Sequence, residues 1–435
     1  MLTTLLTFLP LALAAPQVAF PGAEGLGRFA TGGRTGTNYV VSTLADSGTG
    51  SLRDALSQPN RIITFNVSGV IHIKKRLVIP KATTILGQTA PGVGITTYGN
   101  GWSGSGASDS IVRYIRVRMG AQGDKGKDAM TIANGQNMIF DHVTYTWGRD
   151  ETFSINAYEK AANITIQDCI VAQGLQTHSA GGLMQVKAGL SLFRNLWADN
   201  KTRNPKVKGR NDFVNNVIYN WGGGGGYIAG GSEGDSVANI VGNYFVAGPS
   251  TGKTKAFVRG NEHFKASVKG NYVDHNKDGV LNGEELKASS DAYGGMAVVA
   301  TDMGFPGPEK VMSAPEAIVY VLKNAGASKV RDANDEQLIK EVMSYGKSGK
   351  LIHDESETVW GMAFGAGKKA PEAEGNKTPE AESKENWAMM ADSDGDGIPD
   401  WYEIKMGWDV NGHDAMKIQD SGYTRIEEYA NSLLV

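Results

Sequence analysis

The middle of this chain is built from a short unit that recurs every 21 to 28 residues. Each unit has a strand-like segment, a polar turn and a second strand-like segment, and one turn position falls at residues 116, 142, 169, 195, 216, 243 and 271. No unit could close a sheet alone, and none has the 3.6-residue apolar spacing of a helix. Repeats of this size indicate stacked units that share one core. The chain is therefore predicted to be all-β, folded as a parallel β-helix with one coil per repeat.

The recurring turn position is asparagine in the last four units, at Asn195, Asn216, Asn243 and Asn271. In a parallel stack the same turn position lies above itself in successive coils. We therefore expect a ladder of side-chain amides in which each amide satisfies the next. Cys169 is the single cysteine and lies in an apolar strand pattern, so we expect it to be buried, with no disulfide inside the chain.

A stack of coils exposes its apolar interior at both ends and needs helical caps. Residues 51–56 predict a short helix with Ser51 as N-cap and Asp54 at the third position. Further helices are predicted over 314–323, 334–343 and 423–429. The expected organisation is a signal peptide at 1–15, a β-helix at 16–290, a helical wrapping region at 291–367, a linker at 368–388 and a small calcium-loop segment at 389–435.

The first fifteen residues have the apolar run and the small-residue cleavage site of a secretory signal. The rest of the chain has no apolar run long enough for a membrane helix, and its net charge is −3. We therefore expect a secreted monomer that binds neither membrane nor nucleic acid. Glycosylation sequons at Asn66, Asn163, Asn200 and Asn376 are compatible with that route. A glycan on Asn200 would crowd the basic segment beside it, so we expect that site to be empty or the sugar to point away.

The segment 201–210 carries five cations and no acid between two strand-like segments. We call it the basic strip. A rigid basic strip on a β scaffold suits an acidic polymer, which need not be nucleic acid. The alternative interpretation is a solvated loop that happens to be basic.

Several separate motifs occur in an order that resembles the pectate lyases of polysaccharide lyase family 1. They are the segments 19–28, 50–56, 62–71, 85–92 and 140–143, and the resemblance covers residues 18–290. It implies a right-handed parallel β-helix that uses Ca²⁺ to cleave polygalacturonate, the pectate of plant cell walls, by β-elimination. The acids kept at the expected metal site favour pectate over the methylated polymer.

The resemblance also implies roles for the basic strip. The family signature Arg-x-Pro-x-x-Arg falls on Arg203, Pro205 and Lys208, which makes Arg203 the catalytic base. Because guanidinium groups stay protonated in proteins, a charge-stabilising role for Arg203 is the alternative. Lys208 stands where the family has arginine, so it keeps the charge but cannot form a bidentate clamp. Lys206, Arg210 and His178 are the expected substrate contacts.

The implied Ca²⁺ ligands are Asp128 and Asp150. The family expects a further carboxylate four residues after Asp150, where this chain has Ser154. Glu151 could take over from a shifted turn. We expect that the loss of one carboxylate weakens Ca²⁺ binding in the absence of substrate.

Two further segments fit the twelve-residue spacing of an EF-hand calcium loop, with oxygen ligands at positions 1, 3, 5 and 9, glycine at 6 and glutamate at 12. We interpret both as structural Ca²⁺ sites. The predicted ligands of the first loop are Asp274, Asn276, Asp278, Asn282 and Glu285, and those of the second are Asp392, Asp394, Asp396, Asp400 and Glu403.

Two other functions remain open from the sequence. A β-helix hydrolase acting on the same polymer would need clustered acids and a water, which Asp150 and Glu151 permit. A non-catalytic carbohydrate-binding β-helix is the second, because Ser154 and Lys208 depart from the family pattern.

Overall fold

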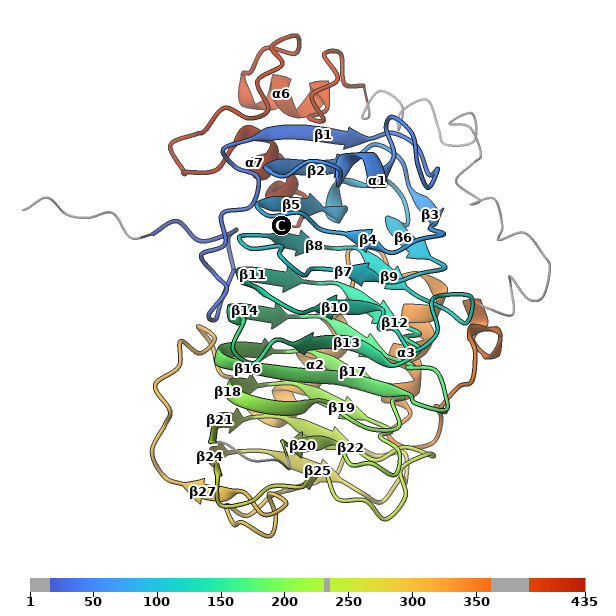
Figure 1. Cartoon of the computed structure of the whole chain (residues 1–435), viewed down its shortest axis with the longest axis vertical. Helices are drawn as coiled ribbons and strands as arrows, with labels where there is room; N and C mark the ends of the chain where they lie inside the picture. Colours follow the sequence, from blue (N-terminus) through green and yellow to red (C-terminus); the bar gives the residue numbers. More distant parts are fainter. Residues whose placement is uncertain (1–15, 231–234, 361–390, 435) are drawn as a thin grey trace, which may run out of the picture.

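Parallel strands stacked in coils form the body of the protein, as Figure 1 shows. The computed structural model describes residues 16–230, 235–360 and 391–434. The predicted signal peptide at 1–15 and the linker at 368–388 lie outside these ranges. The strands build a parallel β-helix of about nine turns, which confirms the predicted fold class. Among the described helices, none has the length and apolar character that a membrane span requires.

One sheet runs along the whole stack and is parallel except at its last pair. Its strands are β3 (Gly69–His72), β6 (Ile95–Tyr98), β9 (Arg116–Arg118), β12 (Thr144–Thr146), β15 (Ile170–Ala172), β17 (Leu196–Ala198), β19 (Val217–Tyr219), β22 (Tyr244–Val246), β25 (Tyr272–Asp274) and β26 (Glu284–Glu285).

The second sheet has two rows of strands that merge in the long strands of the middle coils. The first row comprises β1 (Thr37–Val41), β2 (Arg61–Phe65), β5 (Thr83–Leu86), β8 (Ile111–Arg113), β11 (Gly135–Asp141), β14 (Ala161–Gln167), β16 (Ala180–Phe193), β18 (Lys206–Val214), β21 (Ser236–Val241), β24 (Phe264–Lys269) and β27 (Ala297–Val299). The second row comprises β4 (Leu77–Val78), β7 (Trp102–Ser103), β10 (Met130–Ile132), β13 (Glu151–Asn156), the first residues of β16 and β18, β20 (Tyr227–Ala229) and β23 (Phe257–Val258).

The asparagine ladder is present in the turns between the two sheets. The Asn216 side-chain oxygen accepts from the Asn195 backbone N–H at 3.0 Å, and Asn243 and Asn271 continue the pattern at 2.8 and 3.0 Å. The Cys169 backbone N–H donates to Asn195 at 2.9 Å, so the buried cysteine ends the ladder. The prediction of stacked, mutually satisfied amides is confirmed.

The repeat assigned from sequence is one residue out of register in its first two units. Strand pairing aligns Arg116 with Thr144 and with Ile170, which follows Cys169. His142 aligns instead with Asp168, the residue before Cys169. The left-handed backbone marks the true period, because His142, Asp168, Arg194 and the equivalent residues of later coils all have φ between 52° and 63°. That conformation turns the chain from one sheet into the next. Because residues of different types adopt it, matching of residue types in the sequence does not reveal this position.

The predicted helices are present. Ser51 accepts from the Asp54 backbone N–H at the start of α1 (Leu52–Ala55). The predicted flank helices are α2 (Ala314–Asn324) and α3 (Ala333–Met343), which pack on the outer face of the sheet that contains β15 to β22. Short 3₁₀ turns occur at Gly87–Thr89 and Glu355–Glu357.

The carboxyl-terminal segment covers the amino-terminal end of the stack, a placement the sequence did not predict. Its helices are α6 (Asp400–Met406) and α7 (Arg425–Ser432), and they lie beside β1 and β2 in Figure 1. Their apolar residues form one cluster with Ile62 of β2 and Leu86 of β5. A buried ion pair between Arg34 and Glu427, at 3.0 Å, joins the two regions. The proposed domain boundaries themselves remain predictions.

Asp212 on β18 is a buried carboxyl that should make stability depend on pH. It is 1% exposed, and its Oδ2 has no hydrogen-bond partner among the described residues. Burial, opposed by a hydrogen bond from Asn239 and aided by Asp302, raises the pKa of Asp212 to about 7. An unfolded aspartate ionises near pH 4, so the folded state loses stability as pH rises from about 4 to about 7.

Asp212→Asn should therefore raise the Tm at pH 8 on the order of 5 °C and leave it nearly unchanged at acidic pH. Thermal scans at both pH values test this, with Asp291→Asn as control because the Asp291 side chain is 92% exposed. Equal shifts of the Asp212 variant at both pH values would contradict the role of ionisation.

Candidate active site

The predicted site residues meet in the second row of the long sheet, where successive coils place them side by side. Strand pairing aligns Glu151 with Ala180, and Ala180 forms a bridge with Thr202, the residue before Arg203. Further along the same strands, Ser154 aligns with Leu183 and Leu183 with Lys206. The acidic residues before and within β13 are thereby brought against the start of the basic strip.

Arg203 and Glu151 form an ion pair at the centre of this arrangement. The Glu151 side chain is 7% exposed and that of Arg203 is 27% exposed, so the guanidinium keeps a path to solvent. Arg203 has φ +58°, an uncommon backbone for a side chain of this size. Gly181 allows the close approach of this segment, since a Cβ there would lie 2.5 Å from the Arg203 carbonyl oxygen.

Asp128 lies one coil before Glu151 and is held by several donors. Its Oδ1 accepts from the Glu151 backbone N–H at 3.1 Å, and its Oδ2 accepts from the hydroxyls of Thr131 and Ser154. Burial raises the pKa of Asp128, and the nearby charge of Asp150 adds to that rise against the hydroxyl donors. Ser154, which stands where the family has a carboxylate, therefore supports Asp128 through a hydrogen bond.

Asp150, Glu151 and His178 form a group whose ligand atoms all lie within 4.8 Å of one another. His178 Nε2 lies 2.9 Å from Asp150 Oδ1. His178, predicted to contact substrate, thus stands at the predicted metal ligands. Oxygen ligands from Asp128, Asp150 and Glu151 suit a hard cation such as Ca²⁺.

The remaining cations of the basic strip lie along β18. Lys206 and Lys208 are half-buried on one face of the strand, and the Lys208 ammonium lies 5.3 Å from the centre of the Tyr158 ring. Burial, followed by the charges of Arg203, Arg259 and Lys208, lowers the pKa of Lys206. Arg210 is exposed and lies over the Phe305 ring at 5.2 Å. The basic strip thus concentrates positive charge next to Asp150 and Glu151.

Sequence reasoning missed Arg76, which comes from a coil before Asp128. Its guanidinium donates to the Asp128 carbonyl oxygen at 3.0 Å and to the Trp102 carbonyl oxygen at 3.3 Å. Burial lowers the pKa of Arg76, and the charges of Asp128 and Asp124 oppose that effect. No motif marks this residue, because its role depends on stacking across 52 positions of sequence.

The glycosylation sequon at Asn200 is incompatible with an attached glycan. Asn200 is fully buried, and its side-chain amide donates to the Val171 carbonyl oxygen and accepts from the Gly174 backbone N–H. The expectation that this sequon is empty agrees with its burial.

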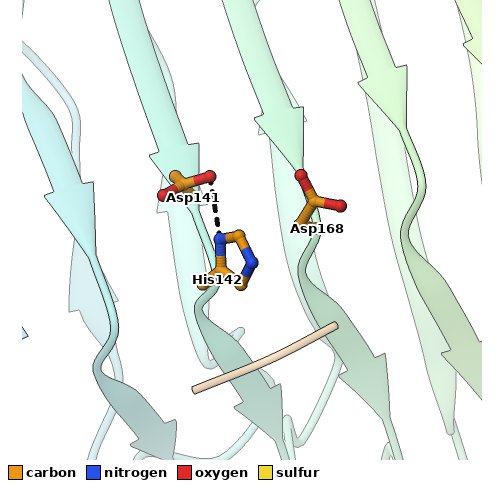
Figure 2. A group of neighbouring side chains, drawn as sticks. All are labelled: Asp141, His142 and Asp168. Carbon is orange, nitrogen blue, oxygen red and sulfur yellow. Dashed lines mark hydrogen bonds and ion pairs between the residues drawn. The ribbon is translucent and has the colours of Figure 1, made fainter. Parts of the chain in front are cut away.

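Figure 2 shows another group, Asp141, His142 and Asp168, at the turns that follow β11 and β14. The contacts of these side chains argue against a metal site. Asp141 accepts from His142 at 2.9 Å and from Arg113 at 2.8 Å, while Arg194 holds Asp168 at 2.9 Å. Burial opposes ionisation of Asp141, but His142 and Arg113 outweigh it and lower its pKa. His142, Asp168, Arg113 and Arg194 line a cleft of about 930 Å³, yet the charges of this group are already paired.

The two predicted calcium loops differ in structure. In the first, the side chains of Asp274, Asn276, Asp278 and Asn282 bond to one another or to loop N–H groups, and Glu285 is exposed in β26. Among the described groups of acids and histidines, none contains a residue of this loop, and a cation there stays a prediction. In the second loop, Asp392, Asp394 and Asp396 converge within 4.8 Å.

Comparison with curated relatives identifies this chain as a polysaccharide lyase. Over 417 residues the chain is 59% identical to a probable pectate lyase C of Aspergillus flavus, covering 96% of this chain and 94% of that protein. A probable pectate lyase C of Emericella nidulans is 57% identical over 435 residues, covering 100% and 97%. The chain belongs to the pectate lyase family. No family model matches it.

Solved structures show the same fold at much lower sequence identity. One described by its anti β-elimination mechanism covers 73% of this chain and 99% of its own, with a TM-score of 0.53 at 15% identity. A pectate lyase bound to a hexasaccharide covers 74% and 100%, with a TM-score of 0.52 at 14% identity.

Proposed function

We propose that this protein cleaves polygalacturonate by Ca²⁺-dependent β-elimination, with Arg203 at the reacting sugar. The observation that carries the proposal is the ion pair between Glu151 and Arg203, which joins the group of Asp150, Glu151 and His178 to the first part of the basic strip. Proteins named probable pectate lyase C, which share more than half of its residues, support the same substrate. The signal-like segment at 1–15 supports secretion.

The chemistry requires both signs of charge. Galacturonate loses the proton at C5, beside its own carboxylate, so a second negative charge develops next to the first. Positive groups fixed beside the carboxylate stabilise that charge more in the transition state than in the ground state. We propose that Lys206 and Lys208 bind the uronate carboxylates of a polymer that lies along the second row of strands.

The residues present fit a hard divalent cation. Asp128 is buried with a raised pKa, and the facing charge of Asp150 contributes to that rise. We propose that Asp128, Asp150 and Glu151 hold Ca²⁺, with His178 positioning Asp150. When bound, Ca²⁺ supplies a positive charge that neutralises the substrate carboxylate and acidifies C5.

The ion pair with Glu151 favours one of the two roles considered for Arg203. A guanidinium that contacts a carboxylate is protonated, and a protonated Arg203 stabilises charge. A role as base would require the loss of that proton. We therefore assign charge stabilisation to Arg203.

A hydrolase would have to use Asp150 and Glu151 as free acid and base. Glu151 is paired with Arg203 and Asp150 contacts His178, which disfavours that chemistry. A hydrolase would release reducing ends without an unsaturated product, and a binding module would release neither.

Chelation gives the direct test of the metal. EDTA should abolish product formation, and added Ca²⁺ should restore it. Asp150→Asn should raise the Ca²⁺ concentration needed for half-maximal activity at least about tenfold, because a ligand carboxylate is lost. Asp291→Asn is the control, and full activity in chelator would refute the metal-dependent mechanism.

A further inference from the structure

We propose that Asp392, Asp394, Asp396, Glu403 and Asp414 form a separate binding site for a divalent cation, Ca²⁺ by its ligand chemistry, which locks the carboxyl-terminal segment onto the first coils of the β-helix. This site is independent of the proposed catalytic function. The site adds Asp414, a residue outside the motif, to the second predicted calcium loop. It also gives the cation a structural role.

Glu403 is the strongest sign that the group receives a cation. It is fully buried on α6, and neither of its carboxylate oxygens has a hydrogen-bond partner among the described residues. One of its oxygens lies within 4.8 Å of a ligand atom of Asp396 and of a ligand atom of Asp414. A buried carboxylate without a partner is costly. A cation among these oxygens removes that cost.

Backbone N–H groups fix the three loop aspartates, whose ligand atoms lie within 4.8 Å of one another, and Asp396 also belongs to the group with Glu403 and Asp414. Asp392 accepts from Gly395 and Gly397, Asp394 from Asp396 and His413, and Asp396 from Ile398 and Ala415. Asp400 is used differently from the prediction, because it bonds to the backbone and the hydroxyl of Ser393. Asp414 comes from a separate segment and takes its place beside Glu403.

The charge of the group is largely uncompensated by protein cations. Arg425 contacts Asp414, whereas the carboxylates of Asp392, Asp394, Asp396 and Glu403 have no ion pair in the described part of the chain. Oxygen-rich, acidic sites of this composition select Ca²⁺ over softer metals.

The loop that carries the site touches the first coils. The Asn38 side chain in β1 donates to the Asp396 carbonyl oxygen. Gly397 has φ +90°, and a Cβ there would lie 2.9 Å from the Thr64 hydroxyl of β2. Ile398 and Ala415, which flank the acidic residues, pack against Ile62 and Leu86. A cation that orders the loop would thus order the surface that covers the open end of the stack.

The test measures the Tm of the full-length protein in EDTA and in millimolar Ca²⁺. Wild type should gain about 5 °C on Ca²⁺ addition. Glu403→Gln should lose that gain, and in EDTA its Tm should equal or exceed that of wild type, because the buried charge is gone. Asp394→Asn should also lose the gain. Asp420→Asn, an exposed acid nearby, is the control and should keep it.

A second comparison separates this site from the catalytic one. Asp150→Asn should keep the Ca²⁺-dependent rise in Tm while its activity needs more Ca²⁺, and Glu403→Gln should show the reverse. If Glu403→Gln gains as much as wild type and the Asp420 control, the cation site is refuted. If Glu403→Gln has a lower Tm than wild type by the same amount in EDTA and in Ca²⁺, the residue is merely structural and the proposal fails.

Discussion

Replacing Arg203 with alanine is expected to lower kcat/KM on polygalacturonate by about 100- to 1,000-fold, because one preorganised group that stabilises the developing charge is lost. The fold should persist, since Arg203 lies at the surface of the second row with a side chain 27% exposed. Removal of Arg203 also leaves Glu151 without its partner, so the Tm should be recorded for each variant. Steady-state kinetics on polygalacturonate with circular dichroism as the folding control measure the effect.

Two further variants help to explain the loss of activity in Arg203→Ala. Arg203→Lys keeps a positive charge but loses the planar fork, so it should recover part of the activity if charge stabilisation dominates. Lys265→Ala removes an exposed cation on β24 outside the basic strip and should leave kcat/KM unchanged. If Arg203→Ala keeps more than about a tenth of wild-type activity, Arg203 is not at the reacting sugar.

Asn216→Ala should reduce the free energy of unfolding by about 3 kcal/mol, because it removes one of the two inner amides of the four-residue ladder. The fully buried Asn216 side chain accepts from Asn195 and donates to the Leu192 carbonyl oxygen at 2.9 Å. Its loss leaves the Asn195 backbone N–H and side chain without their acceptor. Urea unfolding monitored by fluorescence measures the change.

Asn411→Ala is the matched control for the ladder, because Asn411 is exposed at the carboxyl-terminal end. Its unfolding midpoint should stay near that of wild type. If Asn216→Ala changed the unfolding midpoint equally little, the ladder would add little to the free energy of unfolding beyond the packing of the core.

The architecture could be predicted because a repeat imposes one physical requirement many times. Units too short to bury an apolar face must stack, and the recurring asparagines indicated where the stacked turns would bond. The same logic failed in the register of Arg116 and His142. There, left-handed backbone sets the period, and residues as different as His142, Asp168 and Arg194 adopt it.

The site could be predicted only as far as local motifs reach. Arg203, Asp128 and Asp150 stood in recognisable segments, and the structure brings their coils together. Whether Glu151 would face the other two proposed calcium ligands or Arg203 could not be read from sequence, because that choice depends on strand register between coils. The contribution of Arg76 depends on the same register.

The carboxyl-terminal segment illustrates a different limit of prediction from the sequence. Its loop motif and its closing helix were visible in the sequence, yet its position against β1 and β2 depends on contacts that span most of the chain, such as Arg34 with Glu427. Asp414 likewise joins the acidic group from outside any motif.

The reaction proposed for this protein is elimination on pectate that depends on a cation. The most direct measurement is the ultraviolet absorbance of unsaturated uronate during incubation with polygalacturonate, with Ca²⁺ and with EDTA. We predict a steady rise with Ca²⁺ and none with EDTA. New reducing ends without that absorbance would show hydrolysis, and the absence of both products under either condition would contradict catalysis on this polymer.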